Sequence, residues 1–153
     1  MPLLLITFTK KAMSKSGIIL IVEDDIDDRA FLKSVFKKLD ITNEIVWFDN
    51  TDDTLNFLRK TTRSIFLIFS DINLPGKNGL EFKRIIDATP KLRKKSIPFV
   101  FYSTAAHQRD INEAYTQMTV QGFFKKGLDT SETENIIKTI FDYWSLCKHP
   151  NTQ

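Results

Sequence analysis

The sequence is poor in the residues that make cross-links and loop-rich scaffolds. It contains one cysteine in 153 residues, Cys147, which excludes an intramolecular disulfide and a multi-cysteine metal site. This composition fits a reducing, cytoplasmic compartment. Five glycines and five prolines against thirteen phenylalanines argue against a low-complexity chain. With 42% hydrophobic residues, the chain can form a core, which excludes an intrinsically disordered protein.

The sequence also lacks a strong excess of charge and a long apolar run. Its formal net charge is only +3, whereas nucleic-acid-binding proteins gather positive charge on one face or in one run. The one dense basic stretch, Arg93 to Lys95, lies between two expected elements, and we interpret it as a solvated linker. The apolar run at 3–8 is much shorter than the ~18 residues of a membrane span. We therefore expect no nucleic-acid partner and no membrane partner.

The ends of the chain fall outside the expected domain. Residues 1–16 are interpreted as an N-terminal extension without regular structure, and Met13 is an alternative start of the protein. In that extension the lysines follow the apolar run, unlike the order in a secretory signal; an arm that docks elsewhere remains the other interpretation. The domain is expected over 17–146. Residues 147–153 form a polar tail that we expect to fray.

Short apolar runs alternate five times with stretches of helical periodicity. The runs predict strands at 18–22, 44–48, 65–69, 97–102 and 120–124, and the wholly apolar ones are typical of strands covered on both faces. A first helix is predicted at about 27–39. Ile111, Ala114, Tyr115 and Met118 predict the buried stripe of a fourth, and Ser131 with Glu134 predicts a capping box for the last. This alternation predicts an α/β domain with a doubly wound parallel sheet.

Polar residues follow four of the five strands at the point where each strand ends. They are Glu23, Asp24 and Asp25 after the first strand, Asp71 after the third, Ser103 and Thr104 after the fourth, and Lys125 and Lys126 after the fifth. In open α/β sheets, ligands bind at the carboxyl ends of the strands. Clustered carboxylates need a cation, and oxygen ligands without histidine or cysteine favour Mg²⁺, with Mn²⁺ as the alternative.

The same residue types suggest phosphoryl chemistry. An ammonium and a hydroxyl are the donors that a phosphoryl group requires, and a carboxylate can act as the nucleophile that forms an aspartyl phosphate. Asp71 is the central candidate, because the middle strand of such a sheet delivers it to the floor of the cleft.

Four segments together resemble the signature of response-regulator receiver domains of two-component systems. They are residues 19–25, 70–79, 102–105 and 122–126, and the resemblance extends over about 17–146. It implies a chemotaxis-regulator-like, flavodoxin-like (βα)5 fold with strand order 2-1-3-4-5. Asp27 to Arg29 and the phenylalanine-rich first helix also resemble single-domain receivers that are paired with phytochrome-type kinases.

The resemblance implies roles for the acids. Asp71 matches the phosphoacceptor, and Glu23 and Asp24 match the acidic pair. Asp24 would bind Mg²⁺ directly and Glu23 through water, while the backbone carbonyl of Asn73 would complete the protein ligands. Asp25 and Asp27 are better explained as caps of the following helix.

The resemblance also implies a switch. Ser103 matches the hydroxyl that contacts the phosphoryl group, Lys126 matches the lysine of the family, and Phe123 matches the aromatic whose rotamer follows the switch. Gly127 stands where the family usually has a proline, often with a cis peptide; glycine pre-organises no backbone conformation. Lys125 is the alternative ammonium if the register slips by one residue.

The expected function is that of a stand-alone response regulator, because too few residues follow Leu146 for an output domain. A sensor histidine kinase or phosphotransfer protein would phosphorylate Asp71, and a downstream protein would bind the switched surface. That surface is the face of the fourth helix, fifth strand and fifth helix, which also offers a homodimer interface. The protein would not be an enzyme beyond catalysing its own phosphorylation and dephosphorylation.

Two other functions fit parts of the same layout. Phosphohydrolases with an aspartyl-phosphate intermediate resemble this layout, but many carry a second aspartate two residues after the nucleophile, where this chain has Asn73. A pseudo-receiver that only docks partners is the other alternative; the complete set of acids, serine and lysine argues against it.

Overall fold

The computed structural model describes residues 17–104, 107–127 and 129–150; the extension 1–16 and the last three residues of the tail lie outside them. Five parallel strands form one sheet in the order β2-β1-β3-β4-β5. They are β1 (Ile18–Val22), β2 (Ile45–Phe48), β3 (Ile65–Ser70), β4 (Phe99–Ser103) and β5 (Gly122–Lys125). The predicted fold class and strand order are therefore confirmed. The bounds of β1 match the prediction, and the ends of the other strands differ from it by at most two residues.

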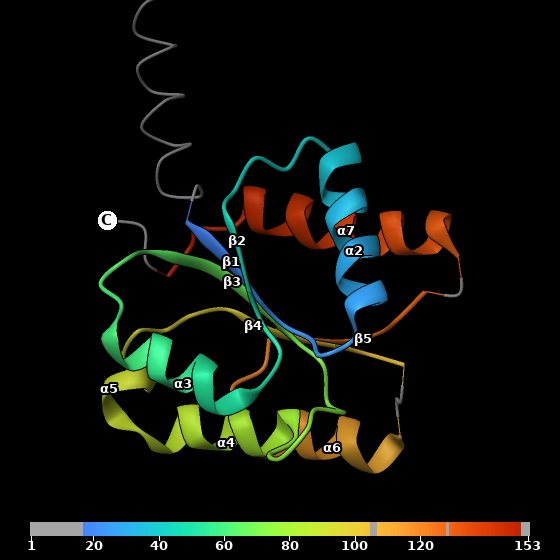
Figure 1. The fold of residues 1–153 in the computed structure, drawn as a ribbon. Helices are drawn as coiled ribbons and strands as arrows, with labels where there is room; N and C mark the ends of the chain where they lie inside the picture. The colour runs from blue at the N-terminus through green and yellow to red at the C-terminus, as the bar shows by residue number, and fades with distance from the viewer. Residues whose placement is uncertain (1–16, 105–106, 128, 151–153) are drawn as a thin grey trace, which may run out of the picture.

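Helices cover both faces of the sheet (Figure 1). One face carries α2 (Ile26–Lys38) and α7 (Thr130–Leu146). The other carries α3 (Thr51–Lys60), α4 (Gly79–Ala88), the short α5 (Pro90–Arg93) and α6 (Gln108–Gln117). Alternate residues of β1 enter the two cores, and all five are buried, which explains its unbroken apolar sequence.

Two helix predictions are wrong in detail. The side chain that caps α7 is Asp129, which accepts a hydrogen bond from the Glu132 amide at 2.9 Å, so the capping box at Ser131 does not form. Asp129 and Glu132 have the same spacing as the predicted pair, two residues earlier. On α6, Tyr115 is 54% exposed rather than buried, and its hydroxyl oxygen accepts a hydrogen bond from the Phe123 amide at 2.9 Å.

The beginning of the C-terminal tail packs on the domain instead of fraying. The side chain of His149 is 1% exposed. Its ring stacks on Phe66 with 5.3 Å between centroids and meets the edge of Trp144. Its Nε2 lies 2.7 Å from the Phe66 carbonyl oxygen. The polar residues around His149 give no indication of this burial, because the partners of the ring lie on β3 and α7.

The basic stretch is also part of the packing. Residues 90–93 form α5, whose Leu92 is 3% exposed. The Lys95 ammonium donates a hydrogen bond to the Thr61 carbonyl at 2.9 Å. The interpretation of Arg93 to Lys95 as a solvated linker is therefore wrong in part: proline at the first helical position starts a short helix there.

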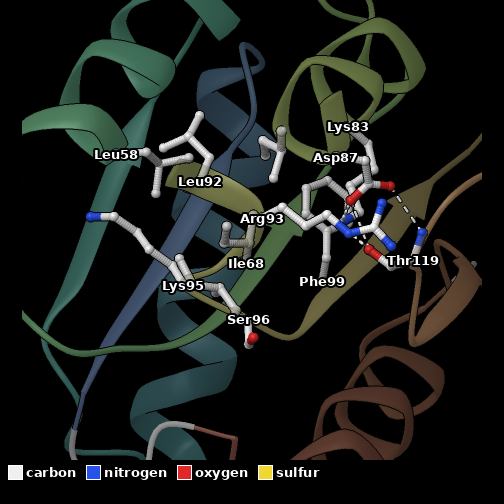
Figure 2. Close-up of a pocket in the computed structure, with 12 residues that line it drawn as sticks. Leu58, Ile68, Lys83, Asp87, Leu92, Arg93, Lys95, Ser96, Phe99 and Thr119 are labelled. Carbon is white, nitrogen blue, oxygen red and sulfur yellow. Dashed lines mark hydrogen bonds and ion pairs between the residues drawn. The ribbon is translucent and has the colours of Figure 1, made fainter. Parts of the chain in front are cut away.

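A buried ion pair within α4, between Lys83 and Asp87, is hydrogen-bonded to Thr119 in the segment before β5 (Figure 2). The Lys83 ammonium lies 2.9 Å from Asp87 Oδ1, 3.0 Å from Thr119 Oγ1 and 5.1 Å from the Phe99 ring centroid. Asp87 Oδ2 accepts a hydrogen bond from the Thr119 amide at 2.9 Å. Burial lowers the pKa of Lys83, and the Asp87 carboxylate opposes that effect. These contacts hold the segment that leads into β5, at the edge of the sheet opposite the carboxyl ends of the strands.

Candidate functional site

Asp71 stands directly after β3, with 8% of its surface exposed. Its two carboxylate oxygens have different surroundings. Oδ1 accepts hydrogen bonds from the amides of Ile72 and Asn73, at 2.6 and 3.2 Å, and from the Ser103 hydroxyl at 2.7 Å. Oδ2 lies 3.1 Å from the Lys126 ammonium. Oδ1 thus orients the carboxylate, and Oδ2 faces the cationic side chain.

The loop after Asp71 is held against it by a glycine. The Gly79 amide donates a hydrogen bond to the Ile72 carbonyl at 2.8 Å. A Cβ atom at Gly79 would lie 2.1 Å from the Asp71 carbonyl oxygen, a distance that no side chain permits. Asn78 caps α4 by accepting from the Glu81 amide at 2.9 Å. The close approach of α4 to the backbone of Asp71 therefore requires glycine at 79.

Lys126 binds acids from three elements of the fold. Its ammonium donates to Glu23 Oε1, to Asp28 Oδ2 at 2.8 Å and to Asp71 Oδ2 at 3.1 Å. Its own amide donates to the Ser103 carbonyl at 2.9 Å. Burial opposes the charged form, but the carboxylates outweigh it and raise the pKa of Lys126. The structure thus brings Lys126 to the acids and leaves Lys125 exposed.

The carboxylates of Glu23, Asp24 and Asp71 offer oxygen atoms within 4.8 Å of one another. Burial raises the pKa of Glu23 to about 8; the bond from Lys126 opposes this rise and the Asp71 charge adds to it. Burial also acts on Asp71, but the Ser103 hydroxyl and the Lys126 ammonium overcome it and lower its pKa. Among the described residues, Glu23 Oε2 is buried without a hydrogen-bond partner. An orphaned oxygen in an all-oxygen cluster fits a hard divalent cation, so these residues could hold one.

The cluster opens to solvent through a cleft, whose lining includes Asp24, Asp71, Asn73, Thr104 and Lys126. Among the predicted metal ligands, Asn73 is exposed on the rim. A small ligand that enters this cleft therefore meets the acids and the ammonium together.

The predicted switch residues lie on neighbouring strands. Ser103 is fully buried at the end of β4. Phe123 is half-buried on β5, and its ring lies 5.6 Å from that of Phe101. The Phe123 amide also donates to Tyr115 on α6, which joins this strand to the helix beside it.

Of the two expected caps of α2, Asp25 is confirmed, whereas Asp27 is wrong because it lies inside the first turn. One acid of the site was missed. Asp25 caps α2 by accepting hydrogen bonds from the amides of Asp27 and Asp28, at 2.8 and 3.1 Å. Asp28 was not singled out, although its carboxylate binds Lys126. Local sequence does not indicate this contact, because its partner lies 98 positions further along the chain.

Gly127 lies in a tight passage between β5 and α7. A Cβ atom there would stand 2.8 Å from Thr133 Oγ1 and 2.9 Å from Glu132 Cβ. The residue after the lysine therefore has no room for a side chain. The start of α7 thus accounts for glycine at this position, where the resemblance leads us to expect proline.

The site and the fold together define a receiver. The chain belongs to the family of response regulator receiver domains, whose model matches residues 19–138. Members of this family act as signalling switches rather than classical enzymes and interact with histidine kinases or phosphotransfer proteins and with downstream targets.

Several particular proteins are similar to this chain. The probable methanogenesis regulatory protein FilR2 of Methanothrix harundinacea is 28% identical over 131 residues, which cover 83% of this chain and 83% of FilR2. The response regulator Rcp1 of Synechocystis is 26% identical, over 83% of this chain and 88% of Rcp1.

Two solved structures have the same architecture. The phosphorylated cyanobacterial phytochrome response regulator RcpA superposes with a TM-score of 0.78 at 27% identity, over 88% of this chain and 98% of that one. The Mn²⁺-bound form of Rcp1 gives a TM-score of 0.76 at 25% identity, over 88% and 99% of the two chains.

None of the helices in the described ranges combines the length and apolar character that a membrane span requires.

Proposed function

We propose that the protein is a stand-alone response regulator that accepts a phosphoryl group on Asp71 from a histidine kinase or phosphotransfer protein. The observation that carries this proposal is the asymmetry of the Asp71 carboxylate. Its Oδ1 accepts three hydrogen bonds, while its Oδ2 faces an ammonium at an open cleft. A carboxylate oriented in this way is prepared to act as a nucleophile.

In the transfer, Oδ2 of Asp71 forms a bond to phosphorus while the P–N bond of a phosphohistidine breaks. The imidazole leaves with the bonding electron pair and takes a proton from solvent. Mg²⁺, with Mn²⁺ as the alternative, would be held by Asp24 and Asp71 directly, by Glu23 through water and by the Asn73 backbone carbonyl. A bound divalent ion supplies positive charge that lowers the repulsion between the acids and the phosphoryl oxygens.

Three further residues would respond to the new charge. Lys126 would neutralise one phosphoryl oxygen, and the Ser103 hydroxyl would turn from Asp71 to donate to another. Movement of Ser103 would let the Phe123 ring turn inward. The face formed by α6, β5 and α7 would then change its shape for a downstream protein or for a second copy of the chain.

We assign the receiver to residues 17–146, with an extension before it and a tail after it, and place the protein in the cytoplasm without a nucleic-acid partner. The near balance of positive and negative charge argues against a nucleic-acid partner, and the single cysteine fits the cytoplasm.

Incubation with acetyl phosphate and Mg²⁺, followed by intact mass, tests the phosphoacceptor. The wild type should gain the mass of one phosphoryl group, and Asp71→Asn should gain none. Equal labelling of the two proteins, or no labelling of the wild type, would exclude the proposal. Steady turnover of p-nitrophenyl phosphate would instead point to a phosphohydrolase.

A further inference from the structure

The lysine of the site binds an acid that lies outside the candidate metal cluster. Asp28, on the first turn of α2, places its Oδ2 2.8 Å from the Lys126 ammonium. The two residues are 98 positions apart in the sequence. The contact therefore ties the start of α2 to the connection between β5 and α7.

The three acids that Lys126 binds are not equivalent. Glu23 and Asp71 also belong to the cluster that could hold a divalent ion, whereas Asp28 does not. The Asp28 side chain is 42% exposed, against 3% and 8% for those of Glu23 and Asp71. Asp28 thus lies at the rim of the cleft, on the solvent side of the ammonium.

A divalent ion would change the balance of these contacts. Its charge would take up the carboxylates of Glu23 and Asp71 and would repel the nearby ammonium. Asp28 would then be the carboxylate left for Lys126 among the three. Without it, the flexible four-carbon side chain can turn into solvent, because an ammonium is strongly hydrated.

We propose that Asp28 is a positioning residue that keeps the Lys126 ammonium beside Asp71 once a divalent ion is bound. The inference rests on the proposed phosphoacceptor function of Asp71. Within the described ranges, no hydrogen bond or ion pair joins Asp28 to Asp71 or to the candidate metal cluster, so Asp28 acts through Lys126. The tight passage at Gly127 positions the backbone of the loop, and Asp28 positions the end of the lysine side chain.

Asp27 offers a matched control on the same helical turn. It is exposed, carries the same charge, and is not among the acids that Lys126 binds in the described residues. Asp28→Asn and Asp27→Asn therefore remove equal charge, but only the former weakens the contact with the ammonium. Asp28→Glu keeps the carboxylate and serves as the rescue variant.

The first measurement follows the Lys126 ammonium by NMR in the ¹⁵N-labelled full-length protein as Mg²⁺ is added. Its resonance is assigned by its loss in Lys126→Met. We expect slow solvent exchange of the ammonium in the wild type, Asp27→Asn and Asp28→Glu at saturating Mg²⁺, and fast exchange in Asp28→Asn. An ammonium that stays equally protected in Asp28→Asn would overturn the proposal.

The second measurement is the rate of phosphorylation by acetyl phosphate at saturating Mg²⁺. Loss of a partly exposed ionic hydrogen bond should lower the maximal rate by about fivefold in Asp28→Asn, without changing the half-saturating acetyl phosphate concentration. Asp27→Asn should stay within about twofold of the wild type on the same reasoning. Equal slowing in both asparagine variants would show that only overall charge matters and would refute the positioning role.

The two measurements separate this inference from the proposed function. A wild type that accepts no phosphoryl group would remove the proposed function, and the ammonium signal would still decide whether Asp28 holds Lys126.

Discussion

Removal of Lys83 from its buried ion pair with Asp87 should measurably destabilise the fold. The two side chains are 3% and 13% exposed, and removing one partner of a buried pair typically costs about 3–5 kcal/mol because the other charge stays buried. In Lys83→Met, Asp87 would keep its two hydrogen bonds from Thr119, at 2.9 and 2.7 Å, and methionine would keep the apolar stem over Phe99. We therefore expect a loss of about 2–3 kcal/mol in the free energy of unfolding, below the full cost of an unpaired charge.

Urea unfolding of Lys83→Met measures this loss, with Lys91→Met on the exposed surface of α5 as the control. The control should differ from the wild type by less than about 0.5 kcal/mol. A loss below about 0.5 kcal/mol in Lys83→Met would refute the reasoning, because it would mean that Thr119 alone satisfies the buried Asp87 carboxylate.

The same pair predicts a dependence on pH. Burial lowers the pKa of Lys83 below its unfolded value of 10.5, so the unfolded chain binds this proton more tightly. The contribution of Lys83 to the free energy of unfolding should therefore rise as the pH approaches 10.5 from below. The difference in stability between the wild type and Lys83→Met should widen over that interval, and a difference that narrows would contradict the assigned pKa direction.

Three other perturbations test separate parts of the structure. Gly127→Ala places a Cβ 2.8 Å from Thr133 Oγ1 and should cost about 1–3 kcal/mol in urea unfolding; a neutral effect would show that the passage can widen. His149→Ala removes a buried ring and should cost about 2 kcal/mol, whereas an unchanged urea midpoint would mean that the tail does not pack in solution. Mg²⁺ should raise the Tm of the wild type by binding the folded state. Asp24→Asn should reduce that rise and Asp27→Asn should not; equal rises in all three proteins would place the ion elsewhere.

Most of the fold could be predicted because a strand that is buried on both faces consists of consecutive apolar residues. Strands β1 and β3 are wholly buried, and each reads as an unbroken apolar run. Their neighbours in the sheet were inferred from the resemblance, since an apolar run does not say which strand it will pair with.

The candidate site could be predicted where residues lie at strand ends. Parallel strands bring the residues at the ends of β1, β3, β4 and β5 to one edge, so the acids, the hydroxyls and the lysines there could be grouped from the sequence. The choice of Ser103 over Thr104 and of Lys126 over Lys125 came from the resemblance. Asp28 could not be identified from either, because its contact depends on where the Lys126 side chain turns after β5.

The two mistaken details have different causes. The burial of His149 depends on Phe66, which lies 83 positions earlier in the chain, so the local sequence does not indicate it. The cap at Asp129 was missed because Asp129 with Glu132 and Ser131 with Glu134 are equally spaced pairs, between which the pattern does not choose.

The most direct test of the central claim is to locate the phosphoryl group after reaction with acetyl phosphate and Mg²⁺. Reduction with borohydride converts an aspartyl phosphate to homoserine, which peptide mass mapping can assign to a position. The account predicts homoserine at position 71, in amounts that depend on Mg²⁺. Homoserine at another acid, or the same yield after the divalent ion has been chelated, would contradict it.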